Sequence, residues 1–286
     1  MRDFSQDLSA LALNTATLGH NLDGYGAGWT PERVIDACAE RGYGGIVFWR
    51  REIGTQAARI GQYARDAGLE VVGLCRTPFL VGPLAPKGHE AIMEDFQASI
   101  DMAAALGAPV LTIVVGGVEA GTKGVRPSLD LVAERVTRMA DVAASHGVKL
   151  ALEPLSPVYG GNRSCLVTMR DAVDMALAID KDNVGVAVDV YHTWWDTDLE
   201  RQLVRLPAAK ILGLHLCDWL ADTTDVLLDR GMMGDGVADI RAIRRSVEAC
   251  GYKGLCEVEI FSARHWWTQE PASVLDEIAH RFRTCC

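Results

Sequence analysis

Short apolar runs alternate with helical segments along the whole chain, and this alternation is the feature that most constrains the fold. The predicted strands are eight runs rich in Val, Ile and Leu, at residues 8–14, 45–49, 69–75, 109–115, 148–153, 184–189, 210–216 and 255–260. Unbroken apolar runs of this length are typical of strands that are buried on both faces of a parallel sheet. A strand followed by a crossover helix, repeated eight times, predicts a right-handed closed (β/α)8 TIM barrel.

Helix signals fill the intervals between these strands. The predicted helices cover residues 30–41, 55–68, 89–106, 128–146, 168–179, 198–206, 239–250 and 271–282. Thr30 and Pro31 form a typical start signal, because threonine caps the first turn and proline suits the first helical position. Ser128 is predicted to cap another helix in the same way.

The length of 286 residues fits one TIM barrel domain spanning residues 1–286, since such barrels need about 250 residues. The structural alternative is a doubly wound open sheet, which would normally carry a glycine-rich phosphate loop after its first strand. Residues 14–19 do not form such a loop. Residues 116–121 have the glycine spacing of a phosphate-binding loop, but Thr122 stands where the lysine is required.

Composition narrows the classes of partner and the compartment. The net charge of −10 disfavours binding to nucleic-acid phosphates, and no segment approaches the roughly 18 consecutive apolar residues of a membrane span. The first residues carry acids and lack a signal-peptide pattern. None of the eight cysteines forms a Cys-x-x-Cys motif, and several lie in apolar strands. We therefore expect free thiols and a cytoplasmic location, with neither nucleic acid nor membrane as a partner.

Four consecutive predicted strands end in side chains that can bind a metal ion. Glu153, Asp189, His215 and Glu259 stand at or near the ends of strands five to eight. The carboxyl ends of barrel strands meet at the rim where barrel enzymes place their chemistry. Isolated acids in apolar strands are costly to bury, and one shared cation would explain all four positions. Glu257 points to the same face as Glu259 but lies one layer lower, where a basic partner inside the barrel is expected.

Each of these residues also has a purely structural explanation. Glu153 could form a salt bridge, Asp189 could cap a loop, and His215 could be a core histidine with its hydrogen bonds satisfied. As a set, three carboxylates and one imidazole are harder ligands than the thiolates that structural zinc prefers. One divalent ion with open coordination positions is predicted: Mn²⁺ is favoured, and Mg²⁺, Co²⁺ or Zn²⁺ also fit.

The spacing of these residues resembles that of a known family. The pattern comprises Glu153-Pro, Asp189-x-x-His192, His215-x-x-Asp218 and Gly251-Tyr-x-Gly-(x)4-Glu259. It is similar to the xylose-isomerase-like TIM barrels, the sugar phosphate isomerase/epimerase group that contains tagatose/psicose 3-epimerases and the dehydratases and isomerases of inosose. The resemblance covers nearly the whole chain.

The resemblance implies roles for individual residues. It implies that Glu153, Asp189, His215 and Glu259 bind the metal ion, that Glu153 and Glu259 also move protons, and that His192 contacts substrate oxygens. The chain departs from the ketohexose epimerases, which usually carry a substrate-binding arginine soon after the histidine of strand seven. The first arginine after His215 is Arg230, in the glycine-rich segment 229–236.

Two further residues are predicted to bind substrate. We expect the glycines near Arg230 to act as hinges, so that Arg230 closes over an anionic group or an oxyanion; a surface arginine in a turn is the structural alternative. Trp194 follows strand six, and tryptophan rings pack against the C–H faces of sugars. A lid core or a contact within a homo-oligomer is the alternative role for the tryptophans.

The favoured function is a divalent-metal-dependent isomerase or epimerase that acts on a small sugar or cyclitol. Proton abstraction next to a carbonyl would give an enediolate, which a glutamate would reprotonate. Loss of a β-hydroxyl from the same intermediate would make the enzyme a dehydratase of a keto-inositol, a keto-sugar or dehydroshikimate. An abasic-site endonuclease would need about three zinc ions and a basic face. A non-catalytic sugar-binding barrel is the remaining alternative.

Overall fold

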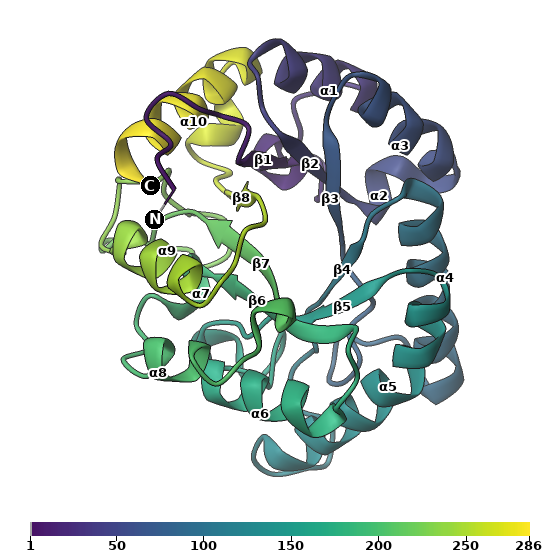
Figure 1. The fold of residues 1–286 in the computed structure, drawn as a ribbon. Helices are drawn as coiled ribbons and strands as arrows, with labels where there is room; N and C mark the ends of the chain where they lie inside the picture. The colour runs from purple at the N-terminus through teal and green to yellow at the C-terminus, as the bar shows by residue number, and fades with distance from the viewer. Residues whose placement is uncertain (1) are drawn as a thin grey trace.

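The computed structural model describes residues 2–286 and consists of a closed parallel barrel surrounded by helices (Figure 1). Its strands are β1 (Leu11–Asn14), β2 (Gly45–Trp49), β3 (Glu70–Cys75), β4 (Val110–Ile113), β5 (Lys149–Leu152), β6 (Val184–Asp189), β7 (Ile211–Leu216) and β8 (Cys256–Val258). Each strand pairs with its neighbour in chain order, and β8 pairs with β1 to close the ring. The predicted (β/α)8 TIM barrel is confirmed.

Helices of very different length connect the strands. The α-helices are α1 (Pro31–Glu40), α2 (Arg50–Ile53), α3 (Ala57–Asp66), α4 (His89–Leu106), α5 (Arg126–Ser145), α6 (Met169–Ile179), α7 (Val190–Thr193), α8 (Leu199–Leu203), α9 (Ile240–Ala249) and α10 (Pro271–Cys285). The 3-10 helices are η1 (Thr15–Leu18), η2 (Gly54–Gln56), η3 (Pro157–Tyr159), η4 (Ala208–Lys210) and η5 (Trp266–Thr268). The shortest of them follow strand ends and shape the rim.

Two predicted helix starts are wrong, each for a local reason. Helix α5 begins at Arg126, and Ser128 lies inside its first turn, where its hydroxyl accepts a hydrogen bond from the amide of Glu119 at 2.9 Å. The segment after β2 is helical from Arg50, earlier than predicted, and Gly54 then interrupts it with a φ of +47°. Glycine tolerates this left-handed value without strain, so α2 ends there and α3 starts a new helix.

Small residues let the barrel strands approach closely. A side chain at Gly185 in β6 would place its Cβ 2.3 Å from the carbonyl oxygen of Lys210, next to β7. Ala151 and Ala187 pack with Leu212 as a small buried layer inside the barrel. Larger apolar residues between the strands and the helices form the main core.

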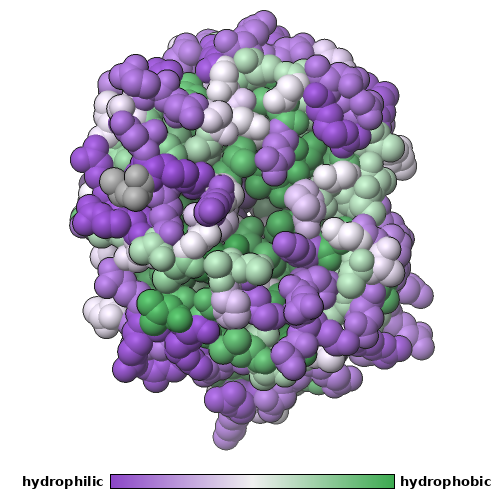
Figure 2. All heavy atoms as spheres, viewed as in Figure 1, coloured by the Kyte–Doolittle hydropathy of each residue, from purple (hydrophilic) through white to green (hydrophobic). Residues whose placement is uncertain are grey.

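The strand register brings the polar strand ends to one level of the rim. Asp189 of β6 pairs in register with His215 of β7, which in turn pairs with Glu257 of β8. The view along the barrel axis shows a mainly hydrophilic outer ring and apolar residues gathered around a central depression (Figure 2). Within residues 2–286, no helix has the length and apolarity needed to cross a membrane.

Candidate active site

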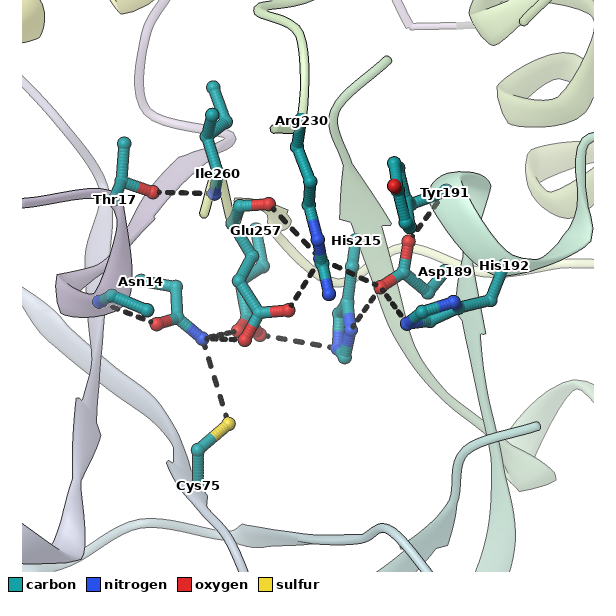
Figure 3. Close-up of polar contacts among 12 residues, drawn as sticks. Asn14, Thr17, Cys75, Asp189, Tyr191, His192, His215, Arg230, Glu257 and Ile260 are labelled. Carbon is teal, nitrogen blue, oxygen red and sulfur yellow. Dashed lines mark hydrogen bonds and ion pairs between the residues drawn. The ribbon is translucent and has the colours of Figure 1, made fainter. Parts of the chain in front are cut away.

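The polar strand ends form one buried network, and Figure 3 shows Asp189, His215 and Glu257 within it. Glu153 directly follows β5, Asp189 ends β6, His215 lies in β7, and Glu257 and Glu259 lie in and just after β8. All five side chains are almost fully buried. Buried acids need a partner for their charge, so the contacts in this network decide what it can do.

His215 connects two of the carboxylates. Its Nδ1 lies 2.8 Å from Glu153 Oε1, and its Nε2 lies 3.3 Å from Glu257 Oε2, so the expectation of a basic partner for Glu257 is confirmed. Burial lowers the pKa of the imidazole, but the negative charges of Glu257, Glu153 and Asp189 outweigh it and raise that pKa well above its ordinary value. His215 therefore carries a proton between these carboxylates unless another cation takes its place.

Arg230 reaches the same network from the segment between β7 and α9. Its Nη1 lies 3.1 Å from Glu259 Oε2 and 3.8 Å from Asp189 Oδ2. The guanidinium carbon is 4.4 Å from the ring centroid of Tyr191 and 4.2 Å from that of Phe261. The side chain is held both by charge and by two aromatic faces, which fixes its direction.

The structural alternative for Arg230, a surface arginine in a turn, is wrong, whereas its closure over bound substrate stays a prediction. Its side chain is buried, and its amide donates to the carbonyl of Phe261 at 2.9 Å. Antiparallel bridges from Asp229 to Ser262 and from Asp218 to Gly231 tie the segment to the rim on both sides. The nearby glycine at 236 serves close packing, since a Cβ there would lie 2.1 Å from the carbonyl oxygen of Trp219.

Arg230→Lys is expected to lower kcat/KM by at least about tenfold, because lysine keeps the charge but loses the planar fork and the stacking on Tyr191 and Phe261. Steady-state kinetics on the true substrate measures the effect, and thermal unfolding measures the cost to the fold. Arg264→Lys is the control, because Arg264 is an exposed arginine bonded to Thr224. Unchanged kinetics for Arg230→Lys would show that Arg230 only neutralises the buried acids.

His192 lies on the opposite side of Asp189. The amide of Ser156 donates to His192 Nδ1 at 3.2 Å, so the ring proton is on Nε2, which faces Asp189 Oδ2 at 3.7 Å. Burial, together with the positive charges of Arg230 and His215, lowers the pKa of His192 well below its ordinary value. His192 is therefore neutral and presents an N–H donor to the pocket.

The donor set fits a divalent cation. Ligand atoms of Glu153, Asp189 and His215 all lie within 4.8 Å of one another, and Asp189 Oδ2 is buried without a hydrogen-bond partner in the described residues 2–286. The buried acids of the network outnumber its two cationic side chains, His215 and Arg230. Oxygen-rich sites with one imidazole suit Mn²⁺, Mg²⁺ or catalytic Zn²⁺.

The fourth predicted ligand, Glu259, lies slightly apart from the other three. Its carboxylate lies near the other possible ligands Glu257 and Cys75 rather than near the first three. The guanidinium of Arg230 lies between Glu259 and Asp189 and contacts both. Asn14 Nδ2 donates to Glu259 Oε1 at 2.9 Å and to Glu257 Oε1 at 2.5 Å. The structure thus gathers Glu153, Asp189 and His215, and it places Glu259 beyond the arginine at the edge of the same network.

Protein treated with a chelator is expected to lose stability as the pH rises. Burial raises the pKa of Glu259 from 4.5 to about 8 and that of Asp189 from 3.8 to about 6. The folded state then binds these protons more tightly than the unfolded chain does, so the stability they contribute is lost between about pH 4.5 and pH 8. The raised pKa of His215 acts in the same direction.

Urea unfolding of the chelated protein at several pH values in this range measures the effect, and added Mn²⁺ should reduce the loss by binding the ionised carboxylates. A chelated protein whose unfolding free energy rises with pH across this range would contradict the proposed burial of these acids.

A pocket opens above this network. Glu153, Glu259, His192 and Arg230 line it from the side of the network. Its aromatic wall was not predicted from the sequence and consists of Trp49, Phe79, Tyr159 and Phe261. This mixed lining suits a small polyhydroxylated ring, because aromatic faces pack against C–H groups while polar side chains meet hydroxyls.

Trp194 does not line this pocket. It packs against Trp219, with ring centroids 5.9 Å apart, and is only partly exposed. The lining of the pocket therefore gives no support to a substrate contact by Trp194, which stays a prediction.

Sequence comparison identifies the family to which the chain belongs and several relatives. Residues 35–285 match the model of the xylose isomerase-like TIM barrel family. The inosose isomerase of Bacillus licheniformis is 25% identical over 251 residues, covering 81% of this chain and 84% of that protein. The 3-dehydroshikimate dehydratase of Pseudomonas aeruginosa is 26% identical over 246 residues, which cover 82% of this chain and 37% of that protein.

Solved structures give the same fold. A crystal structure of a protein from Sinorhizobium meliloti 1021 matches with a TM-score of 0.90 and 38% identity, covering 98% of this chain and 99% of that chain. The IolI protein with a bound zinc atom matches with a TM-score of 0.79 at 19% identity, covering 96% of this chain and 98% of that chain. At that identity the second likeness shows the fold alone.

Proposed function

Because the chain belongs to the xylose isomerase-like TIM barrel family, we propose that it is a divalent-metal-dependent enzyme that isomerises or epimerises a small sugar or cyclitol. The curated relatives at about a quarter identity include inosose isomerases and a dehydratase, which supports an enzyme of this kind. The observation that carries the proposal is that Glu153 and Glu259 line one pocket directly beside the buried cluster of Asp189 and His215.

Glu153, Asp189, His215 and Glu259 would hold the metal ion, with Mn²⁺ as the favoured species. When bound, such an ion polarises a carbonyl and its neighbouring hydroxyl, which makes the adjacent C–H bond acidic. Asp189 Oδ2, which has no hydrogen bond in the described residues, supports a cation at this position. The bound zinc atom of the similarly folded IolI protein supports a divalent metal in general.

Side chains of the protein would carry out the proton transfers and bind the substrate oxygens. Glu153 and Glu259 follow β5 and β8, so their carboxylates approach a substrate in the pocket from two directions. One would remove the proton next to the carbonyl, and the other would return it to the opposite face or to the neighbouring carbon. His192 would donate its Nε2–H to a substrate oxygen, and Arg230 would stabilise negative charge that develops on another.

The aromatic wall supports the proposed chemistry by limiting solvent. Trp49, Phe79 and Phe261 give part of the pocket wall an apolar surface. A dry pocket strengthens the electrostatic interactions inside it. The small-molecule substrate, the cytoplasmic location and a homo-oligomeric state all remain proposals.

The direct test is turnover in D₂O on a panel of ketoses, keto-inositols and dehydroshikimate, with the protein loaded with Mn²⁺. The proposal predicts one substrate whose product carries deuterium at the carbon next to the carbonyl. Product analysis by NMR then separates epimerisation from isomerisation. A protein that binds Mn²⁺ but neither turns over nor exchanges a proton of any panel member would support the non-catalytic alternative.

Dehydration is the second candidate function, and the match to 3-dehydroshikimate dehydratase is the observation that favours it. It begins with the same proton abstraction and ends with loss of a β-hydroxyl, for which His192 Nε2–H is a candidate proton donor. An absorbing unsaturated product from the same panel would assign this reaction in place of isomerisation.

A further inference from the structure

Arginines gather where the pocket borders a second cavity. Arg76 and Arg163 line the pocket itself, and both also line a larger, open cavity of about 1120 Å³ beside it. Arg50 and Arg51 line that outer cavity. Four arginines around one opening are conspicuous in a chain whose net charge is −10.

The four arginines differ in how their charge is balanced. Arg50 forms an ion pair with Asp95, and the exposed Arg51 forms one with Asp23. In the part of the chain that the structure describes, residues 2–286, neither Arg76 nor Arg163 is within ion-pair distance of a carboxylate. Of these four arginines, the two that line the inner pocket are therefore the two without an acidic partner in the described residues.

Arg76 is held rigidly in this position. Its Nη1 donates to the carbonyl of Thr77 at 2.9 Å, and its guanidinium carbon lies 3.8 Å from the ring centroid of Phe79. Burial, and then the like charges of Arg163 and Arg50, lower the pKa of Arg76 to about 10. These positive charges therefore lie close enough to repel one another, which an anion between them would relieve.

Other polar groups at the same cavity also lack partners. Within residues 2–286, the hydroxyl oxygen of Thr77, which is 1% exposed, and Oδ1 of Asn21 are buried without a hydrogen bond, as is Nε of Arg50. All three residues line the outer cavity next to Arg76. Buried polar atoms in native proteins are nearly always bonded, so this wall is suited to a polar ligand.

We infer that Arg76 and Arg163 bind an oxyanion of the substrate, a carboxylate or a phosphate, while its reacting carbon lies at Glu153 and Glu259. This inference rests on the proposed function, because it names the class of substrate that the same pocket takes. Guanidinium forks match the planar geometry of carboxylate and phosphate oxygens and bind them in pairs of hydrogen bonds. The substrate is then an acidic sugar or cyclitol derivative, and neutral polyols bind weakly.

Binding of matched charged and neutral ligands tests this inference without turnover. Isothermal titration would compare quinate with myo-inositol, which have similar polyhydroxylated rings with and without a carboxylate, and glucose 6-phosphate with glucose. The charged member of at least one pair should bind about tenfold tighter or more, as expected for hydrogen bonds to charged groups. A preference for quinate assigns a carboxylate, and a preference for glucose 6-phosphate assigns a phosphate.

Arg76→Met and Arg163→Met should each remove most of that preference. Arg51→Gln is the matched control, because Arg51 lines the same opening but already has Asp23 as a partner, and it should keep the preference. Circular dichroism verifies folding, and Arg163→Met alone suffices if the more buried Arg76→Met does not fold. Equal binding of both members of each pair, or a preference that survives Arg163→Met, would overturn the inference. The proposed proton transfer is tested separately by exchange in D₂O, so either idea can fail alone.

Discussion

Glu259→Gln is expected to abolish exchange of the substrate's α-proton with solvent deuterium and to lower kcat by about 10²–10⁴. Glutamine keeps the size of the side chain and the hydrogen bond from Asn14 Nδ2 to its oxygen, but it cannot accept a proton from carbon. Glu153→Gln should have an effect of the same order, because the proposed mechanism uses one carboxylate on each side of the substrate. NMR of substrate and product after turnover in D₂O measures both variants.

A matched control for these variants is Glu52→Gln. Glu52 is a buried glutamate of the same rim that pairs with His20 and does not line the pocket. Normal exchange in this variant would show that loss of a buried rim carboxylate does not by itself stop the reaction. Exchange at the wild-type rate in Glu259→Gln would remove Glu259 from the mechanism.

His215→Ala is expected to weaken binding of Mn²⁺ or Zn²⁺ by more than about 100-fold. Loss of a residue that merely hydrogen-bonds to a metal ligand already lowers metal affinity by about 10–100-fold, and His215 is proposed as a ligand itself. The alanine removes the imidazole that groups with Glu153 and Asp189 as a possible metal ligand. Titration of chelator-treated protein with either metal, followed by elemental analysis of the bound fraction, measures the loss. Activity should fall in parallel.

His20→Ala is the matched control for metal binding. His20 is buried to a similar degree and pairs with Glu52 at 2.9 Å, away from the cluster. The control should retain one equivalent of metal. If His215→Ala retained it too while folded, the conclusion would be that His215 serves only to neutralise Glu153 and Glu257.

The positions of the strands could be predicted because each strand is an unbroken apolar run, which is a local property of the sequence. The exact ends could not, because hydrogen bonds that form only in the folded chain set them. The strand predicted from Leu8 begins only at Leu11, where the amide of Leu11 closes a turn onto the carbonyl of Leu8. Ser128 has the sequence features of a helix cap, but its hydroxyl accepts a hydrogen bond from the amide of Glu119 instead. Only the folded chain reveals that contact.

Some features of the candidate site could also be predicted from the sequence, and others could not. Glu153, Asp189 and His215 could be predicted to meet, because parallel strands bring their carboxyl ends to one rim and the register fixes their level. The burial of Arg230 could not, since the aromatic rings that hold it come from different strand–helix units. Arg76 was missed for a similar reason, because its lack of an acidic partner depends on every neighbour in space.

The most direct test of the account is a crystal structure of the protein grown with Mn²⁺, with an anomalous difference map collected to locate the ion. The account predicts one strong peak at the barrel rim, within about 2.0–2.3 Å of atoms of Glu153, Asp189 and His215, the range for first-row metals with such ligands. It also predicts that Glu259 replaces its contact with Arg230 by a bond to the ion. A peak elsewhere, or no peak in protein that is fully active, would contradict it.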